Sequence, residues 1–374
     1  MSTTVPDIPI PEAIKPRDGR FGCGPSKVRP EAVEALAAAG TTLLGTSHRQ
    51  RPVRALVGRV RAGVAGLMGL PEGYEVLLGN GGATLVWDAA TFTLIERRSQ
   101  HLSFGEFSSK FAAAAAAAPH LGEPEVIESE PGDHPEPRPD LGVDAYCLTH
   151  NETSTGVAME VRRPAADGLV LVDGTSAVGG LRVEASEFDA YYFSPQKCLG
   201  SEGGTWLAAC SPAALERIER LRAERWVPAS LDLALALENS RKDQTYNTPS
   251  IGTLLLLDDQ LAWIAANGGM EWAAGRADTS AGIIYGWAEA SEYATPFVAD
   301  PAKRSHTVAT VDLDERVPAA TVSQVLRANG IVDTESYRKL GRNQLRVALF
   351  PTIDPDDVRA LTACVDHVVE ALGS

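Results

Sequence analysis

Metal-binding and disulfide chemistry have little support in this sequence. Its 374 residues include five cysteines, and none of them forms a Cys-x-x-Cys pair or lies at a spacing typical of metal ligands. The seven histidines form no His-Glu-x-x-His motif or comparable cluster. Scattered cysteines of this kind are typical of reduced thiols in the cytosol. We therefore expect a cytoplasmic protein without a bound metal.

Long apolar runs and an excess of basic residues are also missing. No stretch approaches the roughly 20 apolar residues of a membrane-spanning helix, and residues 1–20 lack the apolar core of a signal peptide. Lys and Arg number 34 against 49 Asp and Glu, which gives a formal net charge of −15. Such a chain has no cationic excess to neutralise nucleic-acid phosphates or an anionic membrane surface. We expect neither as a partner.

The length and composition indicate a globular protein with more than one domain. Hydrophobic residues make up 44% and charged residues 22%, which is ordinary for a folded globular chain. A length of 374 residues exceeds one average domain. We expect a large α/β domain over residues 17–260 and a smaller C-terminal α/β domain over residues 261–374. Residues 1–16 are expected to pack with the smaller domain.

Three apolar segments, residues 145–149, 169–172 and 190–193, are predicted to be strands. Apolar strands that alternate with helices indicate a parallel sheet covered on both faces. Ligands bind such sheets beyond the carboxyl ends of the strands. Thr153, Asp173 and Lys197 follow these three strands, so we expect them to share one crevice.

The C-terminal part of the chain shows a similar alternation. Helices are predicted over residues 250–267 and 269–291. A strand at 307–313, a helix at 319–328, a strand at 344–350 and a helix at 355–372 follow them. The last four segments form a small α/β unit, and the domain boundary is expected near the two helices that precede them.

A glycine-rich turn lies earlier in the chain. A predicted strand over residues 74–78 leads into Gly79-Asn-Gly-Gly-Ala-Thr84, and a helix is expected from about Leu85. A strand, a glycine turn and a helix together are typical of a phosphate site built from backbone N–H groups. The turn matches neither the dinucleotide motif nor the P-loop, and a tight structural turn remains an alternative.

Two helices are predicted before that turn. The first begins at Pro30 and is expected to end at Gly40, and the second begins at Pro52. His48 and Arg49 lie just before the second helix, where the helix dipole already favours an anion. The pair suits a phosphate or carboxylate, and a solvated basic turn explains it equally well.

Lys197 comes directly after the apolar strand that ends at Phe193. Taken alone it reads as a surface lysine in the loop that leaves the strand. Asp173, however, emerges from a fully apolar strand, where a carboxylate needs a cationic partner. Pyridoxal phosphate requires a lysine for its Schiff base, an acid for its pyridinium nitrogen and donors for its phosphate. The ordered set of phosphate turn, aspartate and lysine therefore indicates this cofactor.

The sequence as a whole resembles the actinobacterial phosphoserine aminotransferases, a family of class V, fold-type I pyridoxal-phosphate enzymes. The resemblance extends from Gly24-Pro25 to Phe350. The motifs that carry it are Ser47-His48-Arg49, Gly81-Gly-Ala-Thr84, Asn151-Glu-Thr153, Asp173, Gln196-Lys197, Asn247-Thr248-Pro249, Tyr337-Arg338 and Arg346.

The resemblance implies a fold, a reaction and a dimer. The fold is a large domain with a mostly parallel sheet flanked by helices, plus a smaller C-terminal α/β domain. The reaction is reversible ping-pong transamination of 3-phosphohydroxypyruvate with L-glutamate, which gives O-phospho-L-serine and 2-oxoglutarate in serine biosynthesis. The related phosphorylated substrate of pyridoxine biosynthesis is also allowed. The active sites are shared between the two subunits of a homodimer.

The resemblance further implies a role for each matching residue. Lys197 forms the Schiff base and Asp173 binds the pyridinium nitrogen. The other cofactor contacts are Ala83 and Thr84 at the phosphate, Gln196 and Thr153 near the ring oxygen, Phe107 at the ring face, and Asn247 and Thr248 from the other subunit.

The substrate contacts implied are basic. Arg346 binds the α-carboxylate, and Arg338 binds the substrate phosphate together with His48 and Arg49 from the other subunit.

Two positions depart from the family pattern. Phe107, expected at the end of a strand, replaces a tryptophan that stacks on the ring, and Tyr337 replaces a histidine near the phosphate. Other class V activities remain alternatives, namely an alanine or serine:glyoxylate aminotransferase, or a cysteine desulfurase that uses Cys198. A catalytically silent α/β protein that binds another phosphate ligand is an alternative from a different class.

Overall fold

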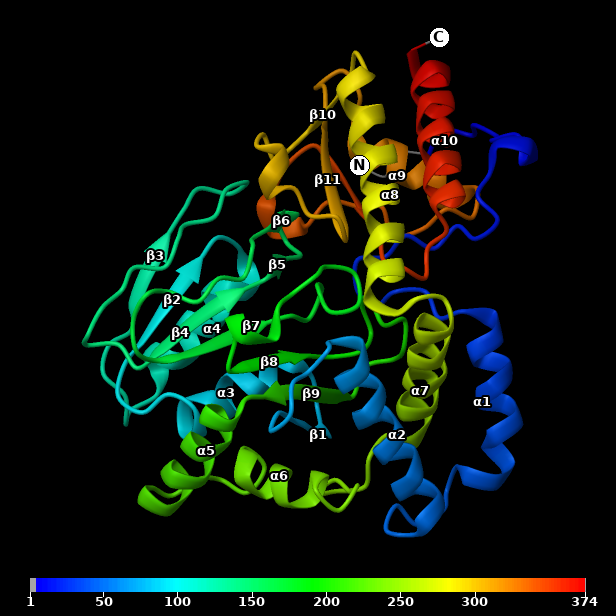
Figure 1. Ribbon diagram of the computed structural model, residues 1–374. Coiled ribbons are helices and arrows are strands. Elements are labelled where there is room, and N and C mark those ends of the chain that lie inside the picture. The colour runs from blue at the N-terminus through cyan, green and yellow to red at the C-terminus, as the bar shows by residue number, and fades with distance from the viewer. Residues whose placement is uncertain (1–4, 374) are drawn as a thin grey trace.

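Two β-sheets organise the computed structural model, which describes residues 5–373 (Figure 1). The larger sheet has seven strands in the order β1-β9-β8-β7-β4-β2-β3. In chain order these strands are β1 (Glu75–Asn80), β2 (Ser99–Ser103), β3 (Glu125–Glu128), β4 (Ala145–Thr149), β7 (Leu169–Asp173), β8 (Ala190–Phe193) and β9 (Thr205–Cys210).

The large sheet buries both of its faces, because successive side chains of a strand point to opposite sides. In β8, Tyr191 and Phe193 join one buried cluster, whereas Ala190 and Tyr192 join another. The first cluster is covered by α2 (Arg51–Leu67) and α7 (Ile251–Ala266). The second is covered by α3 (Ala83–Thr93), α4 (Glu106–Ala117), α5 (Pro212–Glu224) and α6 (Leu233–Ser240). The expectation of a sheet covered on both faces is confirmed.

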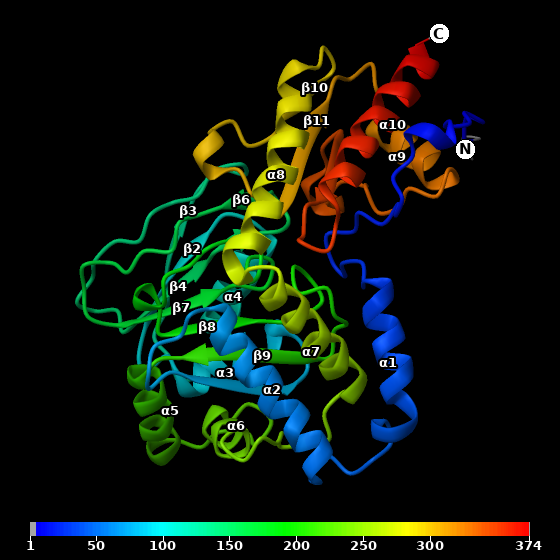
Figure 2. The same ribbon diagram turned by 45° about the vertical axis from the view of Figure 1, so that its right-hand side comes forward.

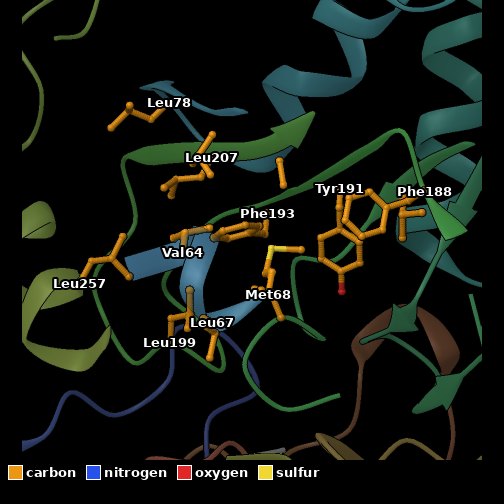
Figure 3. Close-up of a cluster of buried hydrophobic side chains, with 14 of the residues drawn as sticks. Val64, Leu67, Met68, Leu78, Phe188, Tyr191, Phe193, Leu199, Leu207 and Leu257 are labelled. Carbon is orange, nitrogen blue, oxygen red and sulfur yellow. The ribbon is translucent and has the colours of Figure 1, made fainter. Parts of the chain in front are cut away.

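The first cluster is tightly filled by side chains from distant parts of the sequence. Figure 3 shows Val64 and Met68, from the end of α2, close to Phe193 of β8. Leu207 of β9 belongs to the same cluster and is fully buried. This packing fixes the strand from which Lys197 emerges.

The direction of β9 decides where the loop with Lys197 lies. The pairs β8·β7, β7·β4, β4·β2 and β2·β3 are parallel, whereas β9 is antiparallel to both of its neighbours, β8 and β1. A connection between antiparallel neighbours stays at one edge of a sheet. Residues 194–204 therefore lie at the edge where the parallel strands have their carboxyl ends. Strand β9 was not predicted from the sequence.

A second, antiparallel sheet of three strands has its own hydrophobic core (Figure 2). Its strands are β10 (Ala294–Pro296), β11 (Val308–Leu313) and β12 (Gln344–Ala348), and the helices around it are α8 (Gly269–Ala290), α9 (Ala319–Ala328) and α10 (Pro355–Gly373). Ile10 and Ile14 pack on this core, while residues 1–4 of the expected N-terminal segment lie outside the described part. The predicted domain boundary at residue 260 falls inside α7, so the division stays a prediction.

Most predicted elements match within a few residues, and two predictions were wrong. Helix α1 (Pro30–Leu43) continues past Gly40, whose carbonyl accepts a hydrogen bond from the N–H of Leu44. A single glycine inside a helix costs only about 1 kcal/mol, which the rest of the helix can offset. Phe107 lies in the first turn of α4 and not at a strand end, because β2 stops at Ser103.

A short hairpin, β5 (Asn151–Glu152) with β6 (Val157–Ala158), follows β4 and holds Asn151 at the sheet edge. Within residues 5–373, no helix combines the length and the apolar character that a membrane crossing requires.

Candidate active site

A cavity of about 180 Å³ lies at the carboxyl edge of the large sheet. Its walls come from the ends of β4 and β7, the loop after β8, and the first turns of α3 and α4. The predicted site residues that line it are Ala83, Thr84, Phe107, Thr153, Asp173, Gln196 and Lys197. The fold thus brings together residues that lie more than 100 positions apart.

The amine of Lys197 points toward the centre of this set. Its Nζ donates a hydrogen bond to the carbonyl of Cys23 at 2.9 Å and lies 3.5 Å from the Oγ1 of Thr153. It also lies 5.5 Å from the centroid of the Phe107 ring. Burial lowers the pKa of Lys197, and the positive charge of Arg346 acts in the same direction. The amine is therefore neutral more often than that of a surface lysine, as a proton acceptor must be.

Asp173 is buried at the end of β7, close to Lys197. Its Oδ1 accepts from the N–H of Thr175 at 2.9 Å, and its Oδ2 accepts from the indole N–H of Trp87 at 3.2 Å. Burial raises the pKa of Asp173, whereas these hydrogen bonds and the charge of Lys197 oppose the rise. No cation of residues 5–373 lies within 4 Å of the carboxylate. A cationic group bound in the cavity would supply the missing partner.

The N-terminus of α3 opens onto the cavity without a side-chain cap. Its N-cap residue is Gly82, and no side chain bonds the first N–H groups of the helix. Gly81, just before it, has a φ of +116°, a conformation that glycine adopts without strain. The N–H groups of Ala83 and Thr84 belong to this first turn. Such a terminus is a ready site for an anion.

Several buried polar atoms of the lining have no partner among the described residues. They are the Oδ1 of Asn151, the Oγ1 of Thr175 and the Oε1 of Gln196. Buried polar groups normally form hydrogen bonds, so these atoms indicate a polar ligand. An anion site, a buried acid without a cation, a lysine and unpaired polar atoms fit pyridoxal phosphate.

Arg346 lies beside the cavity on β12 of the small sheet. Its Nη1 donates to the carbonyl of Thr153 at 3.3 Å, and its guanidinium lies 5.2 Å from the centroid of the Tyr337 ring. Its Nε is buried and has no partner in the described structure. An arginine guanidinium can bind both oxygens of a carboxylate, and part of the Arg346 guanidinium is free to do so.

Four predicted site residues lie elsewhere on the chain. The Nδ1 of His48 is 3.2 Å from the Oγ1 of Thr248, and Arg49 donates to Gln244 at 2.6 Å. Asn247 and Thr248 are exposed, and Asn247 lines a different, smaller cavity. One chain therefore gathers these four residues into a surface group that does not reach Lys197.

Arg338 is also outside the cavity lining. It begins a short 3₁₀ turn, Arg338–Leu340, and its side chain is exposed. The preceding residue, Tyr337, lies 6.4 Å from Phe107 between ring centroids. Arg338 is thus held near the cavity by its neighbour in sequence.

Two important residues were not predicted. Trp87, which donates a hydrogen bond to Asp173, lies one helical turn after Ala83. This spacing alone could have predicted that the two residues share one face of α3. Glu152 is fully buried, and its Oε2 accepts from the N–H groups of Phe107 and Ser108. No local pattern identifies Glu152 as the cap of a helix 45 residues away.

Cys198 does not have the properties of a nucleophile. The thiol is fully buried, and its Sγ lies 3.3 Å from the carbonyl of Ser176. Burial raises the pKa of the Cys198 thiol, so the reactive thiolate is disfavoured. A desulfurase mechanism would lack its reactive cysteine here.

Comparisons with known proteins give a consistent result. Residues 133–334 match the family Aminotransferase class-V. The chain is 62% identical over 368 residues to a putative phosphoserine aminotransferase of Mycobacterium avium, with 98% of each chain covered. It is 56% identical to a phosphoserine aminotransferase of Rhodococcus opacus, with 97% of this chain and 98% of the relative covered.

The fold is also found among solved structures. A phosphoserine aminotransferase from Cytophaga hutchinsonii superposes with a TM-score of 0.86 at 24% identity, covering 93% of this chain and 99% of its own. At this identity the similarity concerns the fold alone.

Proposed function

This chain belongs to the aminotransferase class-V family, and from that premise we propose that it is a pyridoxal-phosphate-dependent phosphoserine aminotransferase. The reaction is reversible transfer of an amino group between L-glutamate and 3-phosphohydroxypyruvate, by a ping-pong mechanism. The observation that carries the proposal is the single cavity that joins Lys197, Asp173 and the uncapped N-terminus of α3. The names of the whole-length relatives favour this reaction over that of alanine or serine:glyoxylate aminotransferases.

The residues that hold the cofactor each have a separate task. The N–H groups of Ala83 and Thr84 would bind its phosphate, and Asp173 would keep its ring nitrogen protonated. Phe107 would cover the ring, while Thr153 and Gln196 would bind near its oxygen. Bound pyridoxal phosphate supplies an electron sink that makes the substrate Cα proton acidic.

Lys197 performs the proton transfer. With the cofactor and substrate bound, the Lys197 amine would accept the proton from the substrate Cα and would deliver it to the cofactor C4′. The lowered pKa of Lys197 suits this task, because a larger fraction of the amine is neutral and able to accept a proton. The contacts with Cys23 and Thr153 hold the amine beside the cavity.

Arg346 fixes the substrate by its α-carboxylate. The unpartnered Nε and the remaining Nη donors present a planar fork, which matches both carboxylate oxygens. The bond to the Thr153 carbonyl and the Tyr337 ring hold the guanidinium in place. The substrate is thereby oriented with its Cα toward Lys197.

The substrate phosphate requires further cations, and we propose that a homodimer supplies them. Arg338 lies on the same chain near the cavity, whereas His48 and Arg49 lie on a separate surface with Asn247 and Thr248. The Nε2 of His48 is buried without a partner in this chain, which is consistent with a ligand from outside it. In a symmetric dimer each surface group would complete the other subunit's site.

We also propose a large domain over residues 17–260 and a small one over residues 261–374. Lys197 follows a strand of the large sheet, and Arg346 lies on the small sheet. A substrate bound to both would draw the two sheets together and exclude water during proton transfer. The five buried free cysteines favour the reducing cytoplasm as the place of this activity.

A paired assay tests the function. Glutamate is offered with phosphorylated and unphosphorylated hydroxypyruvate, and 2-oxoglutarate is measured. We expect a kcat/KM at least about a hundredfold higher with the phosphorylated acid, because it adds several charge-assisted hydrogen bonds. Equal values, or turnover only with glyoxylate, would contradict the proposal.

A further inference from the structure

We propose that Trp87 is a positioning residue, which holds the Asp173 carboxylate for the ring nitrogen of the bound cofactor. This inference rests on the proposed function. Trp87 lies on α3, lines the cavity and is only 6% exposed. Its indole N–H donates to the Oδ2 of Asp173 at 3.2 Å.

Two donors hold the carboxylate at both of its oxygens. The Thr175 N–H binds Oδ1, and the Trp87 indole binds Oδ2. A carboxylate oxygen has two lone pairs, so each oxygen can still accept a bond from the cofactor. The Thr175 N–H is a backbone donor in the turn that follows β7, whereas the Trp87 indole is a side-chain donor that can set the rotation of the carboxylate.

Trp87 is itself held by the core. Its ring stacks on Phe111 of α4 at a centroid distance of 6.2 Å and an interplanar angle of 17°. Phe111 in turn forms T-shaped contacts with His101 and Tyr192. The indole therefore cannot turn away from Asp173 without disturbing buried rings.

The place of Trp87 on α3 couples two parts of the site. It lies four residues after Ala83, on the same face of the helix and about 6 Å further along its axis. The first turn of α3 offers N–H groups to a phosphate, and the next turn orients the acid for the ring nitrogen. One rigid helix thus sets the distance between the two ends of the cofactor site.

Among the described residues, the carboxylate of Asp173 accepts hydrogen bonds from the Thr175 N–H and the Trp87 indole, and the nearby Tyr192 hydroxyl is buried without a partner. The titratable neighbours are Lys197, Tyr191 and Tyr192, together with His150, whose N–H bonds the Asp173 carbonyl. Burial lowers the pKa of His150 to about 4, so it is neutral at physiological pH. Its Nδ1 is engaged with the Tyr191 hydroxyl at 2.8 Å.

The test compares variants with and without a ring N–H. Trp87→Phe removes the donor and keeps a ring against Phe111. Trp87→His restores the N–H donor. The imidazole ring has the size of the five-membered ring of indole, and its Nε2 can lie where the indole nitrogen lies. Trp287→Phe, which removes an indole on α8 that donates to the Oδ1 of Asp366 at 2.8 Å, is the matched control away from the cavity. The measurements are the dissociation constant for pyridoxal phosphate and the pH dependence of the visible absorbance of the bound cofactor at pH 6–9.

We expect Trp87→Phe to raise the dissociation constant about tenfold, the usual effect of losing a hydrogen bond to a charged group. It should also shift the pH profile, which a merely structural role would leave unchanged. The dissociation constants of Trp87→His and Trp287→Phe should lie within about threefold of the wild-type value. If Trp87→Phe does not fold, Trp87→Met provides a flexible apolar filler without the donor.

Two results would overturn the inference. One is a Trp87→Phe enzyme with the affinity and pH profile of the wild type, and the other is equal impairment of the Phe and His variants. If the wild-type protein itself binds no pyridoxal phosphate, the proposed function fails instead, so the two failures can be told apart.

Discussion

The carboxylate of Glu152 caps the helix that carries Phe107. Its Oε2 accepts from the N–H of Phe107 at 3.1 Å and from the N–H and hydroxyl of Ser108, while its Oε1 accepts from Ser154. Burial raises the pKa of Glu152, and the bonds from Ser108 and Ser154 oppose the rise. Glu152 lies between two residues of the cavity wall, Asn151 and Thr153. The cap therefore joins the hairpin after β4 to the ring that faces Lys197.

Glu152→Gln should destabilise the protein by about 2 kcal/mol. The amide would place N–H donors against existing donors and leave one of them unsatisfied in the interior. We also expect weaker pyridoxal-phosphate binding, because Phe107 loses its fixed position. Urea unfolding and a cofactor titration measure the two effects.

Glu128→Gln, on an exposed position of β3, is the control and should change stability by less than about 0.5 kcal/mol. The capping role would be refuted if the two variants behaved alike.

Arg49→Ala and Arg338→Ala should weaken phosphorylated substrates selectively. Loss of a charge-assisted bond to a phosphate should raise the KM for 3-phosphohydroxypyruvate by about 10- to 100-fold, with little change for unphosphorylated acids. Steady-state kinetics with both acids measure the difference. Arg162→Ala, an exposed arginine that pairs with Glu160, is the control. Equal losses on both acids would exclude these arginines from phosphate binding.

Mixed dimers test whether two chains share each site. Lys197→Ala alone should abolish turnover, because it removes the proton-transferring amine. Co-expression of this chain with an Arg49→Ala chain should restore about one quarter of the wild-type activity: half of the dimers are mixed, and each mixed dimer has one intact site. The readout is activity of the mixture against each variant alone. An additive result, without recovery, would show that Arg49 serves its own chain.

Acid should destabilise the fold through buried histidines. Burial lowers the pKa of His101 to about 3, against 6.5 for an unperturbed histidine. Between these values the unfolded chain binds one more proton than the folded chain, so stability present above pH 6.5 is lost as the pH falls. At pH 4.5 the loss from His101 is about 3 kcal/mol. His150, with a pKa lowered to about 4, acts in the same direction.

His101→Gln should reduce the pH dependence of the unfolding free energy between pH 6.5 and 4.5 by about one proton. Urea unfolding at several pH values across this range measures the slope of the unfolding free energy against pH. Ser99→Ala removes the hydroxyl that contacts the His101 Nε2 at 2.9 Å but keeps the titrating ring, so it should retain the wild-type slope. An unchanged slope in His101→Gln would show that this ring does not control acid unfolding.

Much of the site could be predicted because its residues follow recognisable local patterns. Asp173 and Lys197 follow apolar runs, which predicts that they lie at the ends of strands. Ala83 and Thr84 follow a glycine-rich turn, which predicts the start of a helix. Phe107 was misplaced because the start of α4 depends on Glu152, a contact made across 45 residues. The apolar run of β9 is a local signal for a strand, but its antiparallel pairing with β8 is a property of the sheet and leaves no local mark.

The sequence by itself determined which chemical groups are present and which strands and helices carry them, because side-chain periodicity and turn residues act locally. Only the tertiary structure decided that the indole of Trp87 donates to Asp173 and that the backbone carbonyl of Cys23 accepts from the amine of Lys197. It also decided that His48 and Arg49 lie away from the cavity of their own chain. Those relations depend on strand order and on packing between distant segments, which fix distances that no single stretch of sequence contains.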